Sequence, residues 1–237
     1  LMAVRVNLGR SLQASGQWDS ALAVYNSAIE SYYPPLSSKG ELIAPLFNLP
    51  AHIFEIVSRI GDSVSAQYEM QRAITYYSEL VQRHAGAQLE ASSRAMLARL
   101  YDATGQWQNE IAQLEALSDS TSQAYISVRS RIAEIRGLRL REFDRALSMY
   151  DTLMTRVGKA DTVFYPNMLF QTALIRMEQK NFAAARILLN NLKEHYRSFY
   201  GRTPPAQLAL ARIFELERKR ERAEVEWRPY GRGVPLV

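Results

Sequence analysis

Few residues in this chain are of the types that carry out catalysis. It has no cysteine, which excludes disulfides, thiolate metal sites and a cysteine nucleophile, and it has 3 histidines among 237 residues. His52, His84 and His195 show neither the spacing of a metal site nor that of a nucleophile and its base. The hydroxyl cluster from Ser118 to Ser122 is typical of a helix end followed by a helix cap. With no glycine-rich phosphate loop or nucleophile elbow, the sequence predicts a protein that is not an enzyme and that has no catalytic residue, metal site or cofactor.

Charge is the second chemical feature, and it is uneven along the chain. There are 29 Lys and Arg against 24 Asp and Glu, a net charge of +5, and residues 161–237 alone hold 13 basic and 8 acidic groups. The densest stretch, Glu215 to Arg228, could contact nucleic-acid phosphates, and a helical-repeat nucleic-acid binder using this basic C-terminal third remains an alternative. Acidic residues interleave the stretch, however, with the four-residue spacing of ion pairs on an exposed helix. We therefore expect a solvated helix face here and do not expect nucleic acid as the main partner.

The elements that position these groups are predicted to be helices. In the stretch WDSALAVYNSAIESYY, the apolar residues Trp18, Ala21, Leu22, Tyr25 and Ala28 recur every three or four residues and so share one face of a helix. Strand signals are nearly absent, and prolines stand between the helical runs. No apolar run approaches the roughly 18 residues of a membrane span. The sequence predicts an all-helical protein of short helices.

A tripeptide reveals a period in these helices. Gly-Gln-Trp occurs at Gly16 and again at Gly105, each time between two amphipathic runs. Around it recur a small residue in the first helix, a small residue in the second and an aromatic four positions later, which in the first copy are Gly9, Ala21 and Tyr25. This pattern resembles the tetratricopeptide repeat, a helix pair that cannot bury its apolar face alone and therefore stacks on its neighbours.

The resemblance implies an all-α fold, a right-handed α-α superhelix of antiparallel helix pairs forming one solenoid over residues 1–237. Departures from the pattern are Glu110 and Glu134, which replace small residues, and Arg176, which replaces an aromatic. The sixth repeat ends without a polar capping helix, so self-association through an open end is an alternative. The six expected repeats span approximately residues 2–35, 54–87, 91–124, 127–160, 166–199 and 204–237.

An insertion of about residues 35–53 lengthens the step after the first repeat. It contains a group of apolar residues that a solvated loop would not carry. We expect a short extra helix packed on the solenoid, with docking into the groove or against a partner as the alternative. The apolar residues of the insertion are Leu42, Ile43, Leu46, Phe47 and Leu49.

The resemblance also implies a function. In this family, the first helices of successive repeats line a concave groove that holds an extended peptide or a partner helix. We therefore expect a non-catalytic scaffold that binds a protein or peptide, and a partially acidic peptide with an apolar anchor suits the residue types at the groove positions. Those positions are Arg10, Asp62, Arg99, Asp102, Arg131, Arg139, Phe170, Leu174 and Arg212.

Two further expectations come from subgroups of the family. One subgroup clamps the C-terminal carboxylate of chaperones with Lys and Asn, but the corresponding places here hold Val6, Arg10, Ser58 and Asp62, so this clamp is absent. The last two repeats are similar to those of bacterial envelope-assembly factors. That similarity favours a bacterial scaffold associated with the periplasm or envelope, although the sequence does not fix the compartment.

Overall fold

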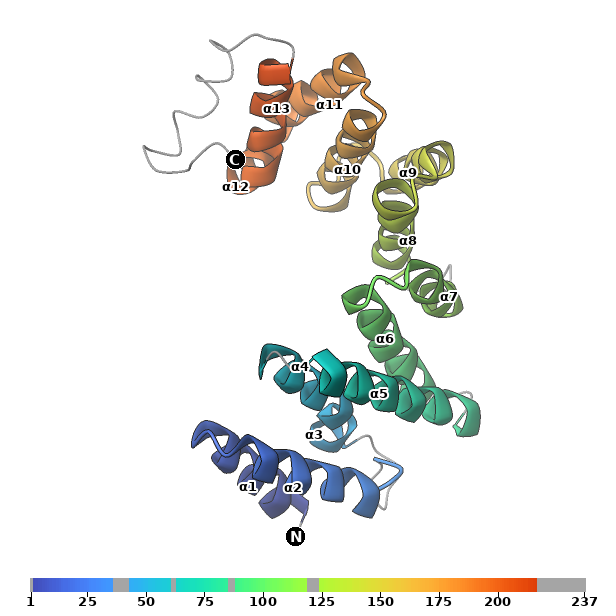
Figure 1. The fold of residues 1–237 in the computed structure, drawn as a ribbon. Helices are drawn as coiled ribbons and strands as arrows, with labels where there is room; N and C mark the ends of the chain where they lie inside the picture. The colour runs from blue at the N-terminus through green and yellow to red at the C-terminus, as the bar shows by residue number, and fades with distance from the viewer. Residues whose placement is uncertain (1, 36–42, 61–62, 85–87, 119–123, 217–237) are drawn as a thin grey trace. The chain divides into compact units, whose positions relative to one another are not determined.

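A computed structural model describes residues 2–35, 43–60, 63–84, 88–118 and 124–216, and those residues contain helices and turns but no strand. The chain divides into two compact units, residues 1–117 and residues 118–237 (Figure 1). The all-helical fold of paired antiparallel helices that the sequence predicts is therefore confirmed. Its division into one domain with six repeats stays a prediction.

Unit 1 is built from three helical hairpins, each a pair of antiparallel helices packed along their length (Figure 1). In each hairpin the second helix begins a few residues after the first one ends. The pairs are α1 (Met2–Ala14) with α2 (Trp18–Ser31), α4 (Leu49–Ile60) with α5 (Ser63–Arg83), and α6 (Gln88–Ala103) with α7 (Trp107–Leu117). The short helix α3 (Ala44–Phe47) lies between the first two pairs.

The described residues of unit 2, 124–216, form two hairpins followed by two single helices. The first hairpin pairs α8 (Tyr125–Glu134), extended by a π-helical segment η1 (Ile135–Arg139), with α9 (Phe143–Val157). The second pairs α10 (Phe164–Glu178) with α11 (Phe182–His195). The short α12 (Arg197–Arg202) and then α13 (Pro204–Leu216) pack against α11.

Each of three second helices buries one tyrosine completely. Tyr25 of α2, Tyr77 of α5 and Tyr150 of α9 are 0% exposed. Burial raises the pKa of the Tyr77 and Tyr150 hydroxyls well above the ordinary value, so both stay protonated and donate hydrogen bonds. The three acceptors are the side-chain oxygen of Gln13 (3.0 Å from Tyr25) and the backbone carbonyls of Phe47 (2.7 Å from Tyr77) and Ser130 (3.1 Å from Tyr150). The aromatic position of the repeat is thus a packing position, as predicted.

The insertion contains α3, whose apolar side chains are buried in the core of unit 1. Leu46 is 1% exposed and Phe47 is 4% exposed, and the Phe47 ring packs edge-to-face on Tyr77 with centroids 5.2 Å apart. These contacts confirm a short extra helix packed against the hairpins. The apolar residues that we described at Ile43 and beyond therefore stabilise the fold.

The two Gly-Gln-Trp copies form the same turn between the helices of their hairpins. Gly16 has φ 76° and Gly105 has φ 69°, a left-handed conformation that glycine adopts without strain. In both turns, the N–H after the glycine donates to a carbonyl near the end of the first helix at 2.9 Å. The repeated tripeptide therefore has a structural cause.

The first helix of the α8–α9 hairpin makes its close contact at a glycine that the pattern did not single out. Glu134, the departure from the small residue of the repeat, is half-buried, and the tight position is Gly137. A Cβ on Gly137 would lie 2.5 Å from Cδ1 of Ile175 and 3.1 Å from Cβ of Ala146. The π-helical segment η1 widens the turn just before this hairpin's second helix, which moves the close contact along the chain.

Some predictions fall on residues outside the described ranges. They concern Asp62, the hydroxyl cluster after Ser118, the stretch of charges after Leu216 and the second helix of the sixth repeat.

Candidate partner-binding site

The first helices of unit 1 form a hollow where the sequence predicts a groove. It lies between α4 and α6, with a volume of about 230 Å³. Leu100 and Met96 are buried in its floor, and Phe54 is half-buried in its wall. The residues that line it are Ala51, Phe54, Glu55, Met96, Arg99, Leu100, Asp102 and Ala103. Two of the predicted groove residues, Arg99 and Asp102, are therefore brought together here.

The charges of this α4–α6 hollow are accessible. Nη2 of Arg99 lies 3.8 Å from Oε1 of Glu55, and their side chains are 71% and 50% exposed. An ion pair so exposed contributes at most about 1 kcal/mol to stability, because water solvates both partners. Arg99 can therefore exchange Glu55 for a carboxylate of a bound peptide at little cost. The apolar floor next to it can accept an aliphatic or aromatic side chain.

The remaining predicted residue of unit 1 that the structure describes is Arg10, which is exposed on α1 and does not line the hollow. Between α1 and α4 lies a partly buried contact that the sequence reasoning missed. Nε2 of His52 is 3.2 Å from Oε1 of Gln13, the same oxygen that accepts from Tyr25. Burial lowers the pKa of His52, although the Glu55 carboxylate opposes this shift. A neutral histidine therefore links the first two hairpins.

In unit 2 the predicted groove residues have different environments. Arg139 and Arg212 are exposed, whereas Arg131 is half-buried and its Nη1 lies 3.0 Å from Oε1 of Glu134. Phe170 is 7% exposed and belongs to the core around α10, α11 and α13, and Leu174 packs against that core. The apolar pair thus contributes mainly to packing, and its role as a peptide anchor stays a prediction.

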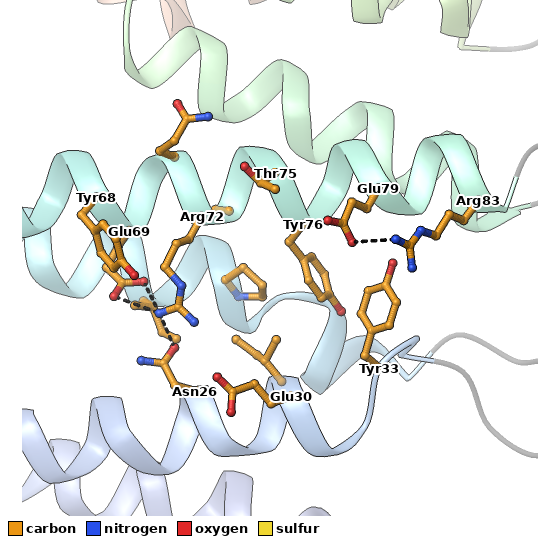
Figure 2. Close-up of a pocket in the computed structure, with 15 residues that line it drawn as sticks. Asn26, Glu30, Tyr33, Tyr68, Glu69, Arg72, Thr75, Tyr76, Glu79 and Arg83 are labelled. Carbon is orange, nitrogen blue, oxygen red and sulfur yellow. Dashed lines mark hydrogen bonds and ion pairs between the residues drawn. The ribbon is translucent and has the colours of Figure 1, made fainter.

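A second hollow of unit 1 was not predicted. It lies between the second helices α2 and α5 (Figure 2), is also lined by Pro50 and Ile53 of α4, and has a volume of about 470 Å³. Helices α2 and α5 are separated in sequence by the inserted segment and by α4, and the residue spacing carried no signal for this α2–α5 cavity.

Polar and aromatic side chains alternate along the wall of the α2–α5 cavity. At one end, Nη1 of Arg72 donates to Oδ1 of Asn26 at 3.0 Å and pairs with Glu69 at 3.2 Å. At the other end, Nη2 of Arg83 lies 4.0 Å from Oε2 of Glu79. Figure 2 shows Tyr76 between these two ends, extending from α5 toward α2, and Tyr33 directed toward Glu79 and Arg83.

Within the described ranges, no three His, Asp or Glu side chains gather closely enough to hold a metal ion. The helices of those ranges also include none that is long and apolar enough to cross a membrane.

Paired helices, buried tyrosines and hollows between neighbouring pairs define a helical-repeat protein. The repeat is identified by its first copy, because residues 3–34 match the family model of the tetratricopeptide repeat. The chain as a whole has the fold of tetratricopeptide-repeat proteins, a fold that generally mediates contacts between proteins. No curated protein matches the sequence.

Solved structures agree with this fold. A tetratricopeptide repeat protein from Parabacteroides merdae is 14% identical, with a TM-score of 0.64 over 99% of this chain and 80% of that one. The putative kinesin light chain TPR-like repeats of Podosopora anserina are 15% identical, with a TM-score of 0.57 over 85% and 97%. BtubC from P. vanneervenii is 15% identical, with a TM-score of 0.55 over 91% and 93%. At such identities the likeness establishes the fold alone.

Proposed function

We propose that this protein is a non-catalytic scaffold that binds an acidic peptide segment of a partner protein through the α4–α6 hollow. The observation that carries the proposal is the exposed Arg99, paired loosely with Glu55 at 3.8 Å beside an apolar floor. A carboxylate of the peptide would replace Glu55 as the partner of Arg99. An apolar side chain next to it would occupy the space between Phe54 and Leu100.

The test is capture of a partner by the full chain from a lysate of its source, at low and high salt, with three forms of the protein. The parent should retain one protein at both salts. Arg99→Glu should lose it, because the reversed charge repels an acidic peptide. Arg197→Glu, the same change at an exposed position of α12, should retain it. Retention of the partner by Arg99→Glu would refute the proposal.

The alternatives give different results in the same experiment. Nucleic acid recovered at low salt and lost at high salt would favour phosphate binding by the basic C-terminal third. Recovery of the protein's own chain alone would favour self-association. A bacterial origin and an envelope location stay predictions.

A further inference from the structure

The α2–α5 cavity is a separate candidate for recognition, because it shares no lining residue with the α4–α6 hollow. Pro50 and Ile53 line the α2–α5 cavity from α4, whereas the α4 residues of the other hollow are Ala51, Phe54 and Glu55. Its volume of about 470 Å³ is within the range of roughly 300–1,000 Å³ of ordinary ligand pockets. The cavity is therefore large enough to enclose a long side chain.

The charges around the cavity leave a negative excess. Three carboxylates line it, those of Glu30, Glu69 and Glu79, against the two guanidinium groups of Arg72 and Arg83. Both arginines already have carboxylate partners on α5, at 3.2 Å for Arg72 and 4.0 Å for Arg83. Glu30 makes no ion pair or hydrogen bond with the residues that the structure describes, and it faces the cavity from α2 (Figure 2). Among the described residues, the Glu30 carboxylate is therefore the lining charge without an opposite partner.

The aromatic groups of the cavity also suit a cation. Tyr33 and Tyr76 pack edge-to-face with centroids 5.6 Å apart. Burial raises the pKa of both hydroxyls, so the rings are neutral and their faces attract positive charge. The wall already holds one contact of this kind, because Cζ of Arg72 lies 5.7 Å from the centroid of the Tyr68 ring. Tyr68 is 63% exposed and can offer its other face.

Other occupants fit less well. A carboxylate or phosphate that replaced Glu79 at the exposed Arg83 would still lie among three carboxylates and only two guanidinium groups, so like charges would repel it. A purely apolar side chain would remove the Glu30 carboxylate from water without giving it a partner, which is unfavourable. A guanidinium or ammonium group at the end of an aliphatic chain matches both the charge and the apolar lining of the cavity.

We propose that the α2–α5 cavity binds an arginine or lysine side chain of a peptide segment. The ammonium or guanidinium group pairs with Glu30 and lies against the tyrosine rings, while its aliphatic part contacts Ile29 and Ile53. This surface is independent of the α4–α6 hollow, so the scaffold carries one site for an acidic peptide and another for a basic one.

The experiment uses the full chain labelled at the isoleucine methyl groups, because Ile29 and Ile53 line the cavity and Ile187 on α11 is 68% exposed far from it in sequence. The probes are acetylated, amidated tripeptides with a central arginine, citrulline or glutamate between alanines, titrated to millimolar concentration. The arginine peptide should shift the Ile29 and Ile53 methyl signals with a saturating curve and leave Ile187 unchanged. The citrulline peptide, which keeps the shape but not the charge, should not.

Variants test the carboxylate. Glu30→Gln should raise the Kd for the arginine peptide roughly three- to fivefold, as expected for loss of a partly exposed ion pair. Glu30→Arg should abolish the shifts, while Glu194→Gln, the same neutralisation on exposed α11, should leave the Kd unchanged. Unchanged methyl signals elsewhere would show that each variant is folded.

Three outcomes would overturn the proposal. They are equal binding of the citrulline peptide, preferential binding of the glutamate peptide, and absence of any shift at Ile29 and Ile53. If free arginine amide bound as tightly as the tripeptide, the site would take a small cation and the peptide assignment would be wrong.

Discussion

Gly9 of α1 is the point of closest approach between the two helices of the first hairpin. A Cβ built on Gly9 would lie 2.7 Å from Cδ1 and 2.9 Å from Cζ of Tyr25. The ring has little room to move, because Tyr25 is 0% exposed and its hydroxyl is held by Gln13 at 3.0 Å. The substitution Gly9→Ala therefore forces either the ring or the whole of α2 to shift.

The change in stability caused by Gly9→Ala is the sum of two opposing effects. Overpacking a well-packed core costs about 1–3 kcal/mol. Replacing glycine by alanine inside a helix stabilises the helix by up to about 1 kcal/mol. We expect Gly9→Ala to destabilise the first hairpin by about 1–2 kcal/mol, which corresponds to a roughly 5- to 30-fold increase in the open fraction.

Native-state hydrogen exchange of the full chain, resolved by peptide mass spectrometry, measures this change locally. Amides of α1 and α2 should exchange faster by that factor, while those of α10 and α11 should keep their rates. Gly201→Ala on α12 is the matched control, because no atom lies within 4 Å of its added Cβ. Combining Gly9→Ala with Tyr25→Leu should cost less than the sum of the single changes, since the shorter side chain relieves the overlap. If the α1 and α2 amides of Gly9→Ala exchanged hydrogen at the same rate as in the parent, the reasoning would be refuted.

Three further predictions concern single side chains. Asp161→Ala should lower the free energy of unfolding of unit 2 by about 1 kcal/mol, because the Asp161 carboxylate caps α10. This carboxylate accepts hydrogen bonds from the N–H groups of Val163 and Tyr165 at 2.8 and 3.2 Å. Unchanged hydrogen exchange of the first α10 amides would contradict this prediction. Burial lowers the pKa of His52 below 6.5, so on acidification the unfolded chain protonates this histidine at a higher pH than the folded chain does. The free energy of unfolding should therefore fall as the pH drops below 6.5. Thermal melts of His52→Gln should show a smaller pH dependence than those of the parent. Lys180 has φ 60°, so Lys180→Gly should raise the free energy of unfolding by about 1 kcal/mol. An unfolding midpoint at or below that of the parent would count against this prediction.

Asp161 illustrates how competing effects set a pKa. Partial burial alone would raise the pKa of its carboxyl, but the backbone N–H donors at the start of α10 lower it below the ordinary value. Its contribution to stability is therefore present above the pKa of the unfolded chain and is lost as the pH falls through the lower folded value. Acid unfolding of unit 2 should accordingly begin at a higher pH in Asp161→Ala than in the parent.

Local patterns predicted the features that depend on a few neighbouring residues. Tyr25, Tyr77 and Tyr150 were placed correctly because helical spacing puts each on the face that meets the first helix. Arg99 and Asp102, two of the positions that the resemblance implies, line the hollow between α4 and α6, and their role in binding stays a prediction. The pattern that placed the tyrosines lies within single repeats of the sequence.

Features that depend on irregular geometry were missed. The π-helical segment around Gly137 shifts a packing contact without an obvious change in the apolar pattern. The burial of Phe170 depends on α13, which follows much later in the chain. The α2–α5 cavity depends on the separation of two helices around the inserted segment, and residue spacing does not encode that separation.

The left-handed turn residue has a consequence for recognising such chains. Gly16, Gly105, Arg141 and Lys180 all have positive φ, and each stands two residues before the second helix of its hairpin. The last two positions hold arginine and lysine in place of glycine, and their backbone torsion has the same sign. The sign of φ at this turn therefore marks the start of the second helix even where the residue type does not, and comparing φ signs along the chain aligns the hairpins independently of their residues.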